Sequence, residues 1–135
     1  MKHRVEQLNQ NCIIVTYDGD LNIKETERIS QAVVDILKKF PTHFDVILDT
    51  RQLKIDNYTH VVKASKILAK YMKKFKYSYI IGSDQTTIKY FRVLLKTLGA
   101  DEDGILQMAT DDEALNHIEN RKRRRPPGQE IQMKF

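Results

Sequence analysis

Four short apolar runs, each followed by a longer amphipathic segment, constrain the fold of this chain most strongly. The runs start near residues 12, 44, 77 and 104, so they are spaced by 32, 33 and 27 residues. Spacings of this length leave room for one helix and two short connections, as a crossover between parallel strands requires. Residues 46–48 (Val-Ile-Leu) are continuously apolar, which is typical of a strand covered on both faces. The pattern therefore predicts an α/β fold with helices packed on a mostly parallel sheet.

The expected elements alternate along the chain and begin with a hairpin. Weak alternation in residues 4–8 and a turn signal at residues 9–11 predict a first strand at the sheet edge, paired with the second. Further strands are expected at residues 12–17, 44–48, 77–81 and 105–108. Helices are expected at about 22–40, 57–75, 85–98 and 110–120. The fold class is therefore α/β, with one mostly parallel sheet of about five strands and four helices.

The net charge of the chain comes from its last fifteen residues. Residues 121–135 carry six basic side chains and one acidic one, which account for the whole net charge of +5. We therefore expect a folded domain over residues 1–120 and a basic, flexible tail over residues 121–135. No apolar run is long enough for a membrane span and no apolar leader is seen, so a cytoplasmic location is expected. The single cysteine, Cys12, lies in an apolar run and is expected to be a buried thiol.

Polar residues follow two of the expected strands. Ligands and partners of open α/β sheets gather at the carboxyl ends of the strands. Asp49 and Arg51 follow the strand at 44–48, and Ser83 and Asp84 follow the strand at 77–81. The next helix would start close to the same end. The sequence therefore predicts a partner-binding surface made of Asp49, Arg51, Asp56, Asn57, Tyr58, Thr59, Ser83 and Asp84.

Four short segments give the chain a family resemblance. They are YDGDLN (17–22), ILDTRQL (47–53), YIIGSD (79–84) and MATDDEALNHI (108–118). With this order of elements, residues 4–120 resemble the STAS domain, the family of the anti-sigma factor antagonists, and its SpoIIAA-like relatives. The resemblance implies a right-handed β-α superhelix that works as a non-enzymatic regulatory or scaffolding domain through protein–protein contact.

In that family, the turn after the second parallel strand carries a phosphorylatable serine in a pattern like D-S-S-G. The corresponding residues here are Asp56, Asn57, Tyr58 and Thr59. Asp56 matches the pattern, whereas the serine pair and the glycine are absent, so the phosphoserine switch is not carried over. Phosphorylation of Thr59 at the start of the following helix remains a hypothesis based on position alone.

Two other functional interpretations are open. The layout also resembles the smaller CRAL-TRIO-like domains, which implies a lipid or small apolar ligand in a cavity between helices and sheet. The dense basic run predicts a polyanion contact, with nucleic acid or an anionic surface, through Arg121, Lys122, Arg123, Arg124 and Arg125. Residues 129–135 end in apolar side chains and are a candidate contact for a sheet edge or for a second subunit in a homodimer.

No constellation of catalytic or metal-binding residues stands out. His3, His43, His60 and His117 have no metal-ligand spacing, and the five glycines are isolated. We therefore expect no enzymatic activity, no catalytic residue, no metal and no cofactor, and we expect a protein partner.

Overall fold

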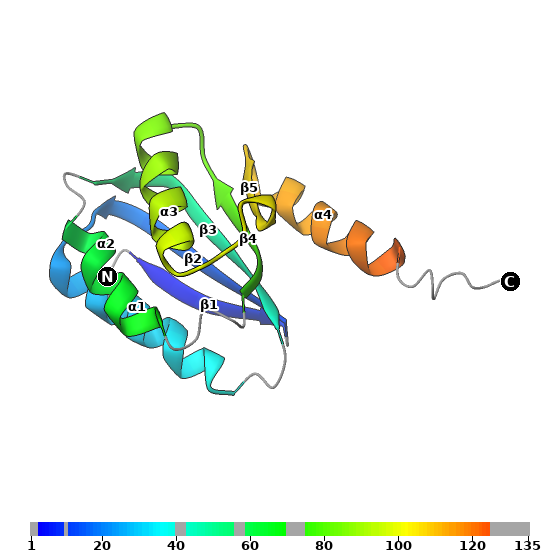
Figure 1. Cartoon of the computed structure of the whole chain (residues 1–135). Helices are drawn as coiled ribbons and strands as arrows, with labels where there is room; N and C mark the ends of the chain where they lie inside the picture. Colours follow the sequence, from blue (N-terminus) through cyan, green and yellow to red (C-terminus); the bar gives the residue numbers. More distant parts are fainter. Residues whose placement is uncertain (1–2, 10, 40–42, 56–58, 70–74, 125–135) are drawn as a thin grey trace, which may run out of the picture.

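A single five-stranded sheet forms the centre of the molecule (Figure 1). The computed structural model describes residues 3–9, 11–39, 43–55, 59–69 and 75–124. The strands follow the order β1-β2-β3-β4-β5, in which only the β1–β2 pair is antiparallel. Their bounds are Arg4–Asn9, Cys12–Asp20, Phe44–Lys54, Phe75–Ile81 and Ile105–Met108. The predicted α/β class and the N-terminal hairpin are thus confirmed.

Helices cover both faces of the sheet, but unequally (Figure 1). One face carries α1 (Ile23–Leu37), α2 (Thr59–Leu68) and α3 (Gln85–Thr97). The other face carries α4 (Asp111–Arg124), which contacts β3, β4 and β5. In the strand order, β1 and β2 follow β3 on the side away from β4 and β5. Part of this second face therefore has no helix of the described chain above it.

The larger core lies beneath α1, α2 and α3. Ile13 and Val15 of β2, and Val46 and Leu48 of β3, belong to this core. Every second side chain of a strand points to the same face, so these residues share the face beneath the three helices. Five apolar residues recur along this segment at the spacing of one helix face, and all are buried, namely Ile88, Phe91, Leu94, Leu95 and Leu98. The hydrophobic pattern of this helix was therefore sufficient to identify its core face.

The smaller core lies beneath α4. Ile47, Tyr79 and Ile81 point to this face and pack against Ala114 and Ile118. Cys12 belongs to the same cluster and is 1% exposed, so the predicted buried thiol is confirmed. Leu115 of the same helix is 39% exposed.

Strands β2 and β3 extend beyond their predicted ends. They were expected to stop at Tyr17 and Leu48, because polar residues follow. Instead β2 continues to Asp20 and β3 to Lys54, with Gly19 paired to Leu53. Backbone hydrogen bonds do not require apolar side chains, and Leu53 is buried at 8% exposure. The polar segment after Leu48 is therefore strand and not turn.

Two helix ends also differ from the prediction. The helix expected to reach residue 75 ends as α2 at Leu68, and Phe75 is the first residue of β4, paired with Phe44. The last helix was expected to end near residue 120, but α4 continues to Arg124. The expected boundary between domain and tail thus falls inside a helix.

Candidate functional site

Asp49 lies inside β3, where the neighbouring strand β4 ends. It is in register with Thr16 of β2 on one side and with Ile81, the last residue of β4, on the other. Beyond this point β3 pairs with β2 alone. The predicted location at the carboxyl end of the sheet is therefore retained, although the residue is in a strand and not in a turn.

Asp49 and Arg51 form a tightly hydrogen-bonded ion pair. The backbone N–H of Arg51 donates to Oδ1 of Asp49 at 3.2 Å, and its Nε donates to the same oxygen at 3.0 Å. Its Nη2 donates to Oδ2 at 2.7 Å. Nη2 also lies 3.8 Å from a carboxylate oxygen of Asp111, the first residue of α4. Such bidentate pairing fixes the direction of both side chains.

The pairing changes the protonation equilibrium of both groups. Hydrogen bonds from the Arg51 side chain lower the pKa of Asp49, and this effect outweighs the burial that would raise it. The same hydrogen bonds raise the pKa of Arg51. Asp49 is largely buried, with 13% of its side chain exposed, whereas Arg51 is 39% exposed. The pair therefore presents an oriented guanidinium to solvent.

The lowered pKa of Asp49 predicts a pH-dependent contribution to stability. Folding favours the ionised carboxylate, so its contribution is complete above the unfolded pKa of about 3.9 and is lost as the pH falls through the lower folded value. We expect Asp49→Asn to lower the free energy of unfolding by about 1 kcal/mol at pH 7, a small value because Arg51 is exposed. Below about pH 3 the difference should shrink. Urea unfolding at both pH values measures it, and an equal difference at both would contradict the pairing.

The ion pair borders a polar depression of about 230 Å³. Three strands contribute to it, because the register aligns Arg4 of β1 with Thr16 of β2 and Thr16 with Asp49 of β3. Between this row and the next pair, β2 advances two residues and β3 three, from Thr16–Asp49 to Asp18–Gln52. Such a register shift bends a strand and redirects its side chains. The polar lining residues are Arg4, Thr16, Asp18, Asp49, Arg51 and Gln52.

Four of these lining residues were not among the predicted site residues, namely Arg4, Thr16, Asp18 and Gln52. Alternation along β2 places Thr16 and Asp18 on one face, which is a signal in the sequence. Their alignment with Arg4 and Asp49 depends on strand pairing, and the register shift beside Gln52 has no local sequence signature.

Ser83 and Asp84 follow β4 at the same end of the sheet. The carboxylate of Asp84 accepts hydrogen bonds from the Thr87 backbone N–H at 3.0 Å and from the Thr87 hydroxyl at 2.7 Å. These bonds lower the pKa of Asp84 and cap the N-terminus of α3. Ser83 is exposed. Asp84 thus has a structural role, and partner binding by these two residues stays a prediction.

Part of the predicted surface lies outside the described residues. Asp56, Asn57 and Tyr58 fall between β3 and α2 in a segment that is not described. Thr59 is the first residue of α2. Its position at a helix N-terminus agrees with the sequence-based assignment, and its phosphorylation stays a prediction.

Arg121, which was grouped with the polyanion-contact residues, is held by the folded domain. Its Nη2 donates to Oδ2 of Asp45 at 2.6 Å, and its Cζ lies 4.0 Å from the centre of the Tyr77 ring. Lys122, Arg123 and Arg124 continue α4, while Arg125 lies outside the described residues. A polyanion contact therefore stays a prediction for residues 122–125, and Arg121 has a partner in the sheet.

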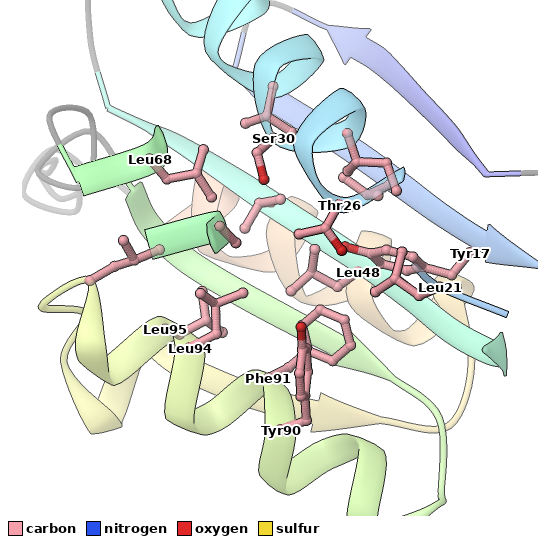
Figure 2. A pocket seen from close by; sticks show the side chains of 16 residues that line it. Tyr17, Leu21, Thr26, Ser30, Leu48, Leu68, Tyr90, Phe91, Leu94 and Leu95 are labelled. Carbon is pink, nitrogen blue, oxygen red and sulfur yellow. The ribbon is translucent and has the colours of Figure 1, made fainter. Parts of the chain in front are cut away.

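An apolar cavity lies on the face of the sheet that is covered by α1, α2 and α3, opposite the face that carries α4. Figure 2 shows the side chains of Leu48, Leu68 and Leu94 around it, with the hydroxyl groups of Thr26 and Ser30 on α1 nearby. Its volume is about 50 Å³. Pockets for drug-sized ligands have volumes of roughly 300–1,000 Å³. The cavity is therefore too small for a lipid, and its size does not favour the CRAL-TRIO-like alternative.

Within the described ranges, no three or more His, Cys, Asp or Glu side chains are grouped so that they could hold a metal ion. In the same part of the chain, no helix combines the length and apolarity needed to cross a membrane. No known sequence family and no curated protein matches this chain.

Solved structures, by contrast, match most of the chain. The unphosphorylated anti-sigma factor antagonist SpoIIAA superposes with a TM-score of 0.62 at 14% identity, covering 87% of this chain and 96% of its own. The chain has the SpoIIAA-like fold. An uncharacterized DUF3478-family protein from Shewanella loihica PV-4, described as having that fold, gives 0.63 at 16% identity and covers 85% and 90%. Phosphorylated SpoIIAA from Bacillus gives 0.57 at 16%, covering 86% and 98%. The fold expected from the STAS resemblance is thus confirmed.

Proposed function

We propose that this SpoIIAA-like chain is a non-enzymatic regulatory or scaffolding domain that binds a protein partner. The contact surface is the carboxyl end of the sheet, where Asp49 and Arg51 of β3 lie at the level of the end of β4, which Ser83 and Asp84 follow, together with residues 56–59. The similarity to SpoIIAA, an anti-sigma factor antagonist, supports an interaction role for this fold.

The observation that carries the proposal is the orientation of Arg51. Its guanidinium is fixed by two hydrogen bonds to Asp49, yet the side chain is 39% exposed. A guanidinium that is already ordered loses little conformational entropy on binding and suits bidentate recognition of a carboxylate. An exposed, oriented arginine beside a sheet end is therefore a suitable anchor for a protein partner.

Protein capture from a lysate tests the proposal. We expect Arg51→Glu to lose at least one protein that the wild type retains, because a reversed charge repels the carboxylate that Arg51 would bind. Tyr58→Ala tests the part of the proposed surface that residues 56–59 contribute. The matched control is Arg92→Glu on α3, since Arg92 is partly exposed and pairs with a carboxylate, Glu102, at 2.9 Å. Equal capture by wild type, Arg51→Glu and Arg92→Glu would refute this surface.

A further inference from the structure

Four polar side chains around the depression make no hydrogen bond to another described residue. They are Arg4, Thr16, Asp18 and Gln52, and all of them line the 230 Å³ space beside the Asp49–Arg51 pair. The closest charged neighbour of Arg4 is Glu6, with Nε and Oε1 3.9 Å apart and both side chains more than half exposed. The four side chains thus line one small space with no side-chain hydrogen bond to another described residue, and the ion pair of Arg4 with Glu6 is long and exposed to solvent.

The arrangement follows from strand pairing and the register shift. Arg4, Thr16 and Asp49 form one row across three strands, with about 4.8 Å between strands. Asp18 lies two residues further along β2, opposite Gln52. The row places Arg4 near enough to Asp49 to contribute to the lowering of its pKa. The depression is therefore built by the fold and not by a single loop.

The charges in the depression select the class of ligand. A simple anion would be attracted by Arg4 and Arg51 but repelled by the carboxylates of Asp18 and Asp49. A simple cation would be attracted by the two carboxylates but repelled by the two arginines. A molecule that carries one positive and one negative group can place each group beside a side chain of the opposite charge. We propose that the depression binds a small zwitterion of the free amino acid type, whose carboxylate contacts Arg4 and Arg51 and whose ammonium contacts Asp18. Thr16 and Gln52 supply neutral hydrogen bonds.

The size of the depression agrees with this class. A volume of 230 Å³ equals that of about eight water molecules in the liquid and is below the roughly 300–1,000 Å³ of pockets for drug-sized ligands. The space accommodates a free amino acid and is too small for a nucleotide. Because the depression is open to solvent, its affinity is expected to be low, with Kd on the order of 1 mM.

This site goes beyond the proposed partner contact. It shares Asp49 and Arg51 with that contact, but its other charges, Arg4 and Asp18, belong to β1 and β2 and not to the proposed partner surface. Ligand binding is measured on the purified chain alone. A failure of ligand binding therefore leaves the partner proposal standing, and the reverse also holds.

Backbone amide NMR titration tests the site. L-Serine and betaine are added at about 20 mM, with sodium acetate and methylammonium chloride as single-charge controls at equal ionic strength. We expect L-serine to shift the amides of residues 16–18 and 49–52. Betaine should shift them less because it has no N–H donors, and the single-charge controls should leave them nearly unchanged.

Two variants complete the test. Arg4→Gln and Asp18→Asn each remove one sign of charge without breaking a described hydrogen bond, and each should weaken L-serine binding about tenfold. The control Arg92→Gln should leave it unchanged. Absence of L-serine shifts at residues 16–18 and 49–52, equal shifts with acetate or methylammonium, or undiminished binding by both variants would overturn the proposal.

Discussion

Replacing Arg121 with alanine is expected to lower the free energy of unfolding by about 3 kcal/mol. The substitution leaves the carboxylate of Asp45, whose side chain is 9% exposed, without the guanidinium that neutralises it. It also removes the cation–π contact with Tyr77, which contributes about 0.5–1 kcal/mol of that loss. Because these contacts join α4 to β3 and β4, the effect should appear in urea unfolding followed by circular dichroism.

The comparison variants separate a buried charge from a general loss of arginine. Arg92→Ala breaks a surface pair with Glu102 and should cost less than about 1 kcal/mol. Adding Asp45→Asn to Arg121→Ala should recover part of the loss, since the unpaired charge is gone. Equal losses for Arg121→Ala and Arg92→Ala would show that the Asp45 pair is not important for stability.

Gly82→Ala is expected to lower the free energy of unfolding by about 2–3 kcal/mol. Gly82 follows β4 with φ +150°, a conformation that residues with a Cβ rarely adopt. An added Cβ would also lie 2.7 Å from Oγ1 of Thr50, which donates a 2.9 Å hydrogen bond to the carbonyl oxygen of Ile81. The substitution therefore strains the backbone and disturbs the bond that joins β3 to β4 next to Asp49.

Two further variants divide this cost. Gly99, exposed after α3, also has positive φ at 95° but lacks the Thr50 contact, so Gly99→Ala should cost only about 1–2 kcal/mol. In the Thr50→Ala background, the cost of Gly82→Ala should fall toward that of Gly99→Ala. An unchanged cost in that background would exclude the Thr50 contact as its cause.

The order of elements was predictable because each apolar run and each amphipathic face has its own local pattern. Strand and helix ends were less predictable, because pairing partners decide them. Asp18 to Asp20 and Asp49 to Lys54 appear polar and turn-like in sequence, yet each segment gains backbone partners from the other. Likewise Phe75 fits an apolar helix face in sequence, while pairing with Phe44 places it in β4.

The candidate site was predictable only in part. Asp49 and Arg51 were identified because they follow an apolar run, and this signal lies within a single segment of the sequence. The contribution of Arg4, Thr16 and Gln52 depends on the alignment of three strands and on a register shift, which no single segment encodes. The contact of Arg121 with Asp45 joins residues 76 positions apart, so a basic run could not reveal it.

Site-specific photo-crosslinking tests the partner-binding surface most directly. A photoreactive phenylalanine analogue is placed at Gln52, exposed beside Arg51, or at Val93, which is 40% exposed on α3. We expect a discrete crosslinked protein from position 52 and none from position 93, and the position 52 product should disappear when Arg51→Glu is added. Crosslinking at 93 alone, or equally at both positions, would contradict a partner-binding surface beside Arg51.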